Sequence, residues 1–447
     1  MKEVNSGIFK AYDVRGVYPD EIDEEVAYRI GRAFVTFLGE RSIVTGRDMR
    51  LSSPPLSRAF IAGATDQGAD VTDIGLCSTD MLYYASGALD MPGAMFTASH
   101  NPKEYNGLKL CRRKAGPISM DTGIAEIRDL VLAGEFPEAA SRGKVTEADM
   151  LERYVEHVLG FIDVTSLRRL KVVADAGNGM AGMILPALFD RLPCELVPHC
   201  FELDGSFPHH QPDPINPENI KLLSAWVLEA GGDLGMAFDG DADRVFLVDD
   251  KGDPVSGSLT TAMVAKRILE TNPGEKIIYN CINSWVVPET IRAYGGTPIR
   301  ERVGHSFIKQ TMAETGAVFG GEHSGHYYFR DNYRADSGLI AAMFILEIVS
   351  LENKPLSEIL APFKVYHASG EINSRVDDIP AKLEEIARAY SRGRVDRLDG
   401  VTVEFDDWWF NVRPSNTEPL LRLNLEAKSR ELMEEKRDEV LAVIRSR

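Results

Sequence analysis

Cysteine is scarce in this chain of 447 residues, and the few cysteines show no pairing pattern. A disulfide framework or a zinc finger needs cysteines that are paired or regularly spaced. The five present are odd in number and form no Cys-x-x-Cys pair: Cys77, Cys111, Cys194, Cys200 and Cys281. The pattern therefore predicts free thiols, as expected for a protein of the reducing cytoplasm.

The chain also lacks a long apolar run. Its longest, residues 337–351, is about 15 residues long and already contains Glu347, whereas a membrane span needs about 20. This segment is therefore interpreted as a buried helix. The first 16 residues contain no apolar core of a signal peptide, so we expect a cytoplasmic location.

Basic residues are fewer than acidic ones. The chain has 50 Lys and Arg against 68 Asp and Glu, a formal charge of −18. An acidic surface repels nucleic-acid phosphates and anionic lipid, so we expect neither nucleic acid nor membrane as a partner. The same charge should oppose a phosphorylated substrate. A hydrophobic fraction of 44% with 26% charged residues is typical of a soluble globular protein.

Alternating helical and extended patterns predict α/β architecture. Short apolar strands, such as 42–45, 93–97 and 233–238, are separated by helical segments, which is typical of βαβ units. The last 80 residues instead alternate like antiparallel strands and end in a charged helix. We predict three α/β domains, over 1–150, 151–252 and 253–366, and a smaller α+β domain over 367–447.

A serine follows the strand at 93–97, in the segment Thr97-Ala-Ser-His-Asn-Pro102. Ligands bind outside the carboxyl ends of strands in open α/β sheets, so Ser99 is a candidate nucleophile for an acyl or phosphoryl group. A simple Ser/Asn-Pro turn is the alternative. No Gly-x-Ser-x-Gly elbow surrounds Ser99.

Three carboxylates lie at alternate positions in Asp239-Gly-Asp-Ala-Asp-Arg244. Asp239, Asp241 and Asp243 can converge on one hard cation, for which oxygen ligands are the appropriate chemistry. An EF-hand needs glycine at its sixth position and usually glutamate at its twelfth, where this chain has Arg244 and Asp250. The EF-hand interpretation therefore fails.

Two further loops carry polar side chains after predicted strands. In Gly321-Glu-His-Ser-Gly-His326, Glu322 can accept hydrogen bonds from vicinal hydroxyls of a sugar, and two histidines leave a weak case for zinc. In Arg413-Pro-Ser-Asn-Thr-Glu-Pro419, an arginine, hydroxyls and backbone N–H groups can cradle a phosphate, or the segment can be a turn that caps a helix.

A glycine motif in mid-chain offers a different interpretation. Gly177-Asn-Gly-Met-Ala-Gly182 matches G-x-G-x-x-G after a predicted strand, and Glu202 follows about 20 residues later, as in a dinucleotide-binding fingerprint. Because the segment lies in mid-chain and the acidic loop of the same domain comes later, we expect these glycines to serve tight helix–strand packing.

The four loops in this order resemble the α-D-phosphohexomutase superfamily, from Phe9-Lys-Ala-Tyr-Asp-Val-Arg-Gly16 to Pro419. The chain is most similar to the bacterial-type phosphomannomutase/phosphoglucomutase family. Phosphoglucosamine mutases typically carry Gly, Gln and Gly where Ala242, His323 and Asn416 stand here. The resemblance implies four domains around a central cleft: three α/β mixed-sheet domains of related topology and a smaller C-terminal α+β domain.

The resemblance also implies a role for individual residues. Ser99 would be the phosphorylated nucleophile, and one Mg²⁺ would be held by Asp239, Asp241, Asp243 and an oxygen on Ser99. The other catalytic residues implied are Arg15, Lys109, Arg244 and His326. The residues implied to bind substrate are Tyr12, His305, Glu322, His323, Ser324, Arg413, Ser415, Asn416 and Thr417.

The expected reaction is reversible phosphoryl transfer between O1 and O6 of mannose phosphate, and also of glucose phosphate, through a hexose 1,6-bisphosphate that is both intermediate and activator. Positioning and charge neutralisation supply most of the catalysis of phosphoryl transfer, and Arg244 and Lys109 suit that role. The general base is His326 or Lys109.

Three alternatives stay open at this point. The chain could be a phosphoglucosamine mutase, or a phosphatase in which water discharges Ser99, or a phosphosugar-binding protein without catalysis. We expect a monomer or a weak homodimer that binds hexose phosphates.

Overall fold

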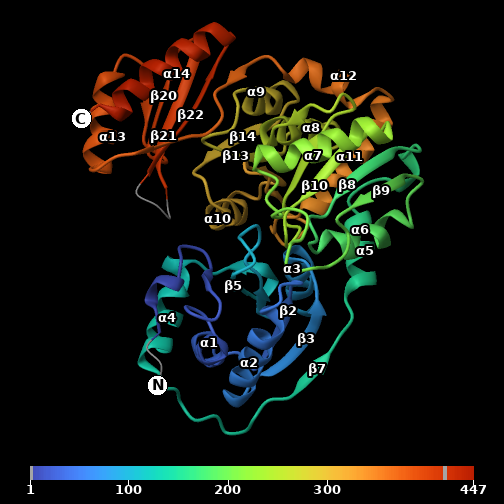
Figure 1. The fold of residues 1–447 in the computed structure, drawn as a ribbon, viewed down its shortest axis with the longest axis vertical. Coiled ribbons are helices and arrows are strands. Elements are labelled where there is room, and N and C mark those ends of the chain that lie inside the picture. The colour runs from blue at the N-terminus through green and yellow to red at the C-terminus, as the bar shows by residue number, and fades with distance from the viewer. Residues whose placement is uncertain (1–3, 416–419, 447) are drawn as a thin grey trace. The chain divides into compact units, whose positions relative to one another are not determined.

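A computed structural model describes residues 4–415 and 420–446 of the chain (Figure 1). It divides into two compact units, the first formed by Met1–Val255 with Ser324–Ser357 and the second by Ser256–His323 with Glu358–Arg447. All five cysteines are free, as predicted. Among the described helices, none is both long enough and apolar enough to cross a membrane.

The N-terminal part of the first unit is a mixed sheet in the order β1-β5-β4-β2-β3-β7, with β6 beside β5. Strand β2 runs parallel to β3 and β4, whereas β5 is antiparallel to β1 and β4. Figure 1 shows a long connection that carries β7 along the edge of this sheet. The strands are β1 (Val14–Val17), β2 (Ser42–Arg47), β3 (Asp70–Leu76), β4 (Gly93–Phe96), β5 (Tyr105–Arg112), β6 (Gly116–Pro117) and β7 (Val145–Glu147).

Helix α1 shows how local sequence sets the ends of these elements. The Asp23 side chain accepts a hydrogen bond from Val26 N, and Gly39 ends the helix in the left-handed conformation with φ of 65°. Its apolar face packs into the core of the sheet with Phe34, Phe60 and Phe96. The helices of this part are α1 (Glu24–Leu38), α2 (Ser53–Asp66), α3 (Thr79–Leu89), α4 (Ile124–Ala133) and α5 (Leu151–Leu159).

A second sheet in the first unit has the order β12-β11-β10-β8-β9. Strand β10 is buried along its whole length, runs parallel to β8 and forms an antiparallel hairpin with β11. The acidic segment 239–244 is the turn of that hairpin, since Phe238 pairs with Val245. The elements are β8 (Lys171–Asp175), α6 (Ala181–Phe189), β9 (Glu195–His199), α7 (Pro217–Ala230), β10 (Leu234–Phe238), β11 (Val245–Val248) and β12 (Pro254–Val255).

Two further elements complete the first unit: β16 (Tyr327–Phe329) and α11 (Gly338–Glu352). Helix α11 is buried from Gly338 to Ser350, which confirms the prediction of a buried helix over 337–351.

The second unit begins with three parallel strands, in which β13 lies between β14 and β15. Strand β14 is absent from the sequence prediction because its residues, Thr-Pro-Ile-Arg-Glu, are mostly polar and at least partly exposed, without a period of two. The elements are α8 (Gly257–Thr271), β13 (Lys276–Asn280), α9 (Val286–Ala293), β14 (Thr297–Glu301), α10 (His305–Thr315) and β15 (Phe319–Gly321).

The remainder of the second unit is an antiparallel sheet in the order β17-β22-β21-β20-β19, with β18 also beside β22. The antiparallel strands and the charged C-terminal helix predicted for the last 80 residues are confirmed. The elements are α12 (Leu356–Leu360), which starts in the first unit, β17 (His367–Ala368), β18 (Ile372–Arg375), α13 (Ile379–Ala389), β19 (Arg394–Asp396), β20 (Val401–Glu404), β21 (Trp408–Pro414), β22 (Leu420–Ala427) and α14 (Arg430–Arg445).

A buried carboxylate joins two helices of the first unit beneath the acidic turn. Asp80, in the first turn of α3, is completely buried and accepts a hydrogen bond of 2.6 Å from Oγ of Ser337, the N-cap of α11. Burial raises the pKa of Asp80 to about 7, because desolvation disfavours the charged form. The carboxyl therefore binds a proton in the folded chain at pH values where the unfolded chain has lost it.

We expect Asp80 to make the stability of the first unit depend on pH. Because the folded pKa lies above the unfolded one, the contribution of Asp80 is complete below pH of about 4 and is lost as pH rises through about 7. The unfolding free energy of the wild type should fall across that window, relative to Asp80→Asn, by up to about 1.4 kcal/mol per pH unit. Denaturant titrations from pH 4 to 8 measure this, with exposed Asp121→Asn as the control. Parallel pH profiles of wild type and Asp80→Asn would contradict it.

Candidate active site

Ser99 lies on a constrained loop directly after β4. It is 4% exposed and has a left-handed φ of 51°, which is unusual for a residue other than glycine. Its N–H donates to Thr97 Oγ1 at 2.8 Å, and its Oγ donates to Asp239 Oδ2 at 2.7 Å. The serine predicted as nucleophile therefore lies against the first carboxylate of the acidic turn.

The Arg50 guanidinium holds the backbone of this loop. It donates to the carbonyl oxygens of residues 99, 101, 102 and 105 at distances of 2.7 to 3.0 Å. Arg50 is itself completely buried and lies 3.3 Å from Asp48 Oδ2. In a regular strand, backbone carbonyl groups accept hydrogen bonds from a neighbouring strand. Here the Arg50 side chain donates those hydrogen bonds instead. The sequence analysis did not identify this residue.

The acidic turn brings its three carboxylates together. Asp239, Asp241 and Asp243 are each at most 1% exposed, and each offers a carboxylate oxygen within 4.8 Å of the others'. Within residues 4–415 and 420–446, no hydrogen-bond donor reaches the buried Oδ1 atoms of Asp241 and Asp243. Buried oxygens without donors, in an all-carboxylate set, fit a hard divalent cation.

Lys109 supplies a positive charge to the same carboxylates. From β5, its Nζ lies 2.7 Å from Asp241 Oδ2 and 2.5 Å from Asp243 Oδ2. Although burial lowers the pKa of Lys109, these carboxylates hold it well above its usual value. Conversely, burial raises the pKa of Asp241, but Lys109 brings it below the usual range. Thr79 also donates to Asp241 Oδ2, at 2.5 Å.

Arg244 connects the acidic turn to the serine. Its Nη2 donates to Ser99 Oγ at 3.1 Å and to Asp239 Oδ2 at 2.8 Å, and it also reaches His100 Nδ1. Burial and the Arg244 charge hold the pKa of His100 well below its usual value, so its ring is neutral and accepts this bond. Burial, opposed by Arg244, raises the pKa of Asp239 to about 7.

His326 reaches the acidic turn from a distant part of the chain. A short antiparallel bridge pairs it with Arg244, and its Nδ1 lies 2.9 Å from Asp336 Oδ2 and 4.0 Å from Asp243 Oδ1. Burial lowers the pKa of His326, but the Asp336 carboxylate raises it above its usual value overall. Asp336 therefore fixes the orientation of the ring, a contact that sequence analysis did not predict.

Two other predicted residues lie near β1. Arg15 Nη1 donates to Asn101 Oδ1 at 2.7 Å, so it reaches the loop of Ser99, and its guanidinium also contacts Asp13. Tyr12 is partly buried just before β1. The first unit thus brings together Ser99, the three aspartates, Lys109, Arg244 and His326, with Arg15 at the edge of the cluster. Ser324 also belongs to this unit.

The second unit contains the predicted sugar-binding residues Glu322, His323 and His305. Glu322 is 2% exposed, and its Oε1 accepts hydrogen bonds from Asn280 Nδ2 at 3.2 Å and Gly304 N at 3.1 Å. His305 follows directly as the first residue of α10. His323 Nδ1 lies 3.0 Å from Ser258 Oγ. The predicted segment 321–326 is therefore divided between the two units.

Arg413 in the second unit has a partner that the sequence analysis missed. It is paired in register with Arg422 on the adjacent strand, and the two guanidinium groups bind opposite oxygens of Glu371, at 3.0 and 3.2 Å. Arg422 Nη2 also donates to Ser415 Oγ at 3.2 Å. Two arginines that hold one carboxylate are well suited to a phosphate. Asn416 and Thr417 lie outside the described residues.

The glycine motif at 177–182 packs against other backbone. A Cβ on Gly179 would lie 2.7 Å from the carbonyl oxygen of Gly240, and one on Gly182 would lie 2.2 Å from that of Phe201, two residues after β9. Met180 N already donates to Gly240 O at 2.9 Å. The motif thus supports the acidic turn, and the close approach expected of its glycines is confirmed.

Family comparisons agree with this arrangement. Models of the phosphoglucomutase/phosphomannomutase alpha/beta/alpha domains I, II and III match residues 6–138, 152–252 and 256–366, and the C-terminal domain model matches residues 371–443. Four such domains in this order define a phosphohexomutase, an isomerase that transfers a phosphoryl group within a hexose phosphate. The chain belongs to the phosphoglucomutase/phosphomannomutase family, which confirms the resemblance found in its motifs.

Individual relatives match over nearly the whole chain. A phosphomannomutase of Escherichia coli (strain K12) is 42% identical over 431 residues, covering 94% of each chain. A protein named "phosphohexose mutases" from Xanthomonas campestris pv. campestris is 42% identical over 446 residues, covering 98% of this chain and 99% of the relative. The crystal structure of a phosphoglucomutase/phosphomannomutase family protein from Burkholderia thailandensis superimposes with a TM-score of 0.91 at 34% identity, covering 99% of this chain and 98% of that one.

We expect Arg50 to set both stability and the position of Ser99. In Arg50→Lys the ammonium has three donors without the planar fork, so at least one of the four carbonyl groups loses its partner. A buried acceptor that loses a charged donor costs about 1.5 to 3 kcal/mol. Denaturant unfolding should show a loss of that size, together with slower isomerisation of a hexose phosphate. The exposed Arg58→Lys on α2 is the matched control, and equal behaviour of the two variants would refute this role.

Proposed function

We propose that this chain interconverts the 1-phosphate and 6-phosphate of mannose, and also those of glucose, through a phosphorylated serine and a hexose 1,6-bisphosphate. The contact of Ser99 Oγ with Asp239 and Arg244, beside three buried carboxylates, carries the proposal. The names of the E. coli and Xanthomonas relatives support the class of sugar.

Ser99 is the nucleophile and the phosphoryl carrier. Its O–H donates to Asp239 Oδ2 at 2.7 Å, so the hydroxyl oxygen lies directly beside the proposed metal ligands. In the forward direction phosphoserine donates its phosphoryl group to the free hydroxyl of the hexose phosphate. The other phosphoryl group of the resulting bisphosphate is then transferred to Ser99, which restores phosphoserine, and the isomeric hexose phosphate is released.

One Mg²⁺ would be held by Asp239, Asp241, Asp243 and an oxygen of phosphoserine 99. The donor set is entirely oxygen, and the unbonded Oδ1 atoms of Asp241 and Asp243 support it. When bound, Mg²⁺ withdraws charge from the transferring phosphoryl group. Lys109 then no longer has to neutralise both carboxylates by itself and becomes available to the substrate.

Arg244 and Lys109 neutralise the oxygens of the transferring group. Arg244 already donates to Ser99 Oγ, so its guanidinium lies beside the phosphorus position of a phosphoserine. Arg15 contributes a further cation at the loop, through its contact with Asn101. Removal of one such donor typically slows the reaction about a hundredfold or more.

His326 is the better of the two candidates for the general base. The carboxylates around Lys109 hold its pKa well above the usual value, so the amine stays protonated. An imidazole has an ordinary pKa far below that of an amine, and although Asp336 raises the pKa of His326, it also fixes the ring, with Nδ1 2.9 Å from its carboxylate. His326 would take the proton of the attacking hydroxyl and return it on the reverse step.

The remaining residues bind the substrate. Glu322, His323, Ser324, His305 and Tyr12 would contact sugar hydroxyls in either orientation of the bisphosphate. Arg413, Ser415, Asn416 and Thr417 would hold the phosphate that is not reacting, with Arg422 as a second cation beside Arg413. In this proposal phosphate replaces Glu371 between the two arginines.

The organisation proposed for the whole chain is four domains, over 1–150, 151–252, 253–366 and 367–447. We propose a cytoplasmic enzyme, a monomer or weak homodimer, whose partners are hexose phosphates and not nucleic acid or membranes. A phosphoglucosamine mutase is the second candidate, and a phosphosugar phosphatase is the third.

We expect Ser99→Ala to abolish isomerisation. Conversion of mannose 1-phosphate, glucose 1-phosphate and glucosamine 1-phosphate, in a coupled assay with Mg²⁺ and a trace of glucose 1,6-bisphosphate, should fall at least about a thousandfold. Intact-mass analysis should show one phosphoryl adduct on the wild type and none on Ser99→Ala. Full activity of the variant would refute the mechanism. Preference for glucosamine 1-phosphate would favour the second candidate, and release of inorganic phosphate faster than isomerisation would favour the third.

We expect Asp241→Asn to weaken Mg²⁺ binding and phosphoryl transfer together. The variant removes one of three carboxylates and a partner of Lys109. The Mg²⁺ concentration for half-maximal activity should rise at least about tenfold, and kcat at saturating Mg²⁺ should fall at least about a hundredfold. Asp249→Asn, on the turn after β11, is the matched control. Unchanged Mg²⁺ dependence of Asp241→Asn would contradict the assignment.

A further inference from the structure

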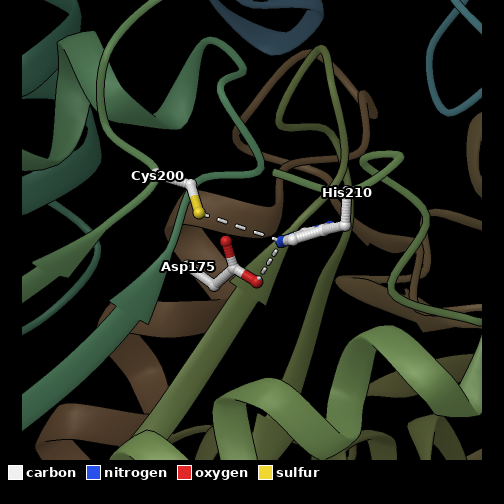
Figure 2. A group of neighbouring side chains, drawn as sticks. All are labelled: Asp175, Cys200 and His210. Atoms are coloured by element: carbon white, nitrogen blue, oxygen red, sulfur yellow. Dashed lines mark hydrogen bonds and ion pairs between the residues drawn. The ribbon is translucent and has the colours of Figure 1, made fainter. Parts of the chain in front are cut away.

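A second cluster of metal-ligand side chains lies in the first unit, apart from the acidic turn. Asp175 is the last residue of β8, Cys200 directly follows β9, and His210 lies on the connection from β9 to α7. Figure 2 shows the carboxylate, thiol and imidazole pointing toward one another. His210 Nε2 lies 3.0 Å from Asp175 Oδ2 and 4.0 Å from Cys200 Sγ, and the three ligand atoms all lie within 4.8 Å of one another.

One ring hydrogen of His210 lies on Nδ1. Nδ1 is 2.9 Å from the carbonyl oxygen of Gln211, and a carbonyl can only accept, so Nδ1 carries a hydrogen. Nε2 therefore faces a carboxylate oxygen and a sulfur at once. A proton on Nε2, the hydrogen of the Cys200 thiol or a bound metal ion can each fill the space between these three atoms.

The contacts exclude a catalytic triad of the cysteine-hydrolase type. In such a triad the carboxylate and the nucleophile contact different ring nitrogens. Here Asp175 and Cys200 both face Nε2, while Nδ1 is occupied by the backbone. A metal-binding histidine, in contrast, commonly donates its second N–H to a backbone carbonyl, which fixes the tautomer and orients the ring.

The surroundings hold the three side chains in place. Asp175 is 2% exposed, and its Oδ1 accepts a hydrogen bond of 2.9 Å from Gly177 N, which leaves Oδ2 for the cluster. Gly177 has φ of 53°, and a Cβ there would lie 2.9 Å from Pro212 Cβ and 3.7 Å from His210 Cε1. Glycine at this position therefore lets the His210 segment approach β8.

We propose that Asp175, Cys200 and His210 form a binding site for a transition-metal dication of the zinc type. Sulfur, nitrogen and oxygen donors together suit Zn²⁺ and not Mg²⁺. Tetrahedral zinc with bonds of about 2.0 to 2.3 Å places its ligand atoms about 3.3 to 3.8 Å apart. The observed separations of 3.0 and 4.0 Å lie within a few tenths of an ångström of that range. Water completes the fourth position.

A metal here would act on the loop of Ser99 through the connection between β9 and α7. Gln211, next to His210, donates from Nε2 to the carbonyl oxygen of His100 at 2.7 Å. On the same connection, the Phe207 ring lies 5.1 Å from the Arg50 guanidinium that holds the Ser99 loop. Binding of a metal by Cys200 and His210 would fix the chain on both sides of Phe207 and directly before Gln211, so the site would hold this connection against the loop of Ser99.

Metal titration of the full chain tests the proposal. The protein is stripped with a chelator, saturated with Mg²⁺ to occupy the acidic turn, and titrated with Zn²⁺ against a chromogenic chelator and separately with Co²⁺. The wild type should bind one equivalent and show a thiolate-to-cobalt charge-transfer band. Cys200→Ser should lose the band, and Cys200→Ser and His210→Ala should each bind Zn²⁺ on the order of a hundredfold more weakly. Zn²⁺ should raise the Tm of the wild type and not of Cys200→Ser.

Matched variants separate this site from other binding. Cys194→Ser removes a partly buried cysteine immediately before β9 and should retain the band, and Asp241→Asn should retain the Zn²⁺ equivalent. Circular dichroism checks that Cys200→Ser and His210→Ala are folded. Absence of the band from the wild type, its persistence in Cys200→Ser, or loss of the Zn²⁺ equivalent in Asp241→Asn alone would overturn the proposal. The first result would leave His210 and Asp175 as an ion pair, and the last would place the metal on the acidic turn.

Discussion

The constraint on which the active site depends is the burial of three carboxylates on one hairpin turn. Asp239, Asp241 and Asp243 lie at alternate positions, almost without exposure, where their charges cannot be screened by water. Asp241 and Asp243 are paired with Lys109 on β5, and Asp239 is paired with Arg244 at the end of the same turn. The rest of the site is arranged around this requirement.

The same requirement determines how Ser99 is presented. A serine hydroxyl is a weak nucleophile unless its surroundings organise the proton and the developing charge. Here Asp239 and Arg244 both contact Oγ, and Arg50 holds the loop backbone in a left-handed conformation from beneath. A buried, ion-paired arginine that binds the carbonyl groups of the loop fixes the geometry of the loop.

The formal charge of −18 describes the surface and not the site. In the first unit Arg15, Lys109 and Arg244 gather beside the serine, and in the second unit Arg413 and Arg422 share one carboxylate. Screening over about 8 Å at physiological salt weakens the repulsion from distant acidic groups. The net negative charge of the chain is therefore compatible with a sugar phosphate as ligand, because basic side chains are concentrated at these positions.

Much of this protein could be predicted from the sequence because the signals are local. Apolar runs and turn residues gave the buried strand β10, the buried helix α11 and the antiparallel strands near the C-terminus, and Ser99 and Asp239–Asp243 are recognisable because each motif is continuous in the chain. The tertiary structure alone decided the partners that come from far away. Arg50, Asp336 and Arg422 belong to no motif. Arg50 is 49 positions from Ser99 in the chain, and folding brings it against the loop. Asp336 is 10 positions from His326, and Arg422 is 9 positions from Arg413, and only the fold places each pair in contact or in register. Burial, which cannot be read from the sequence, then strengthens the electrostatic interactions between these charges, because it removes the water that would otherwise screen them.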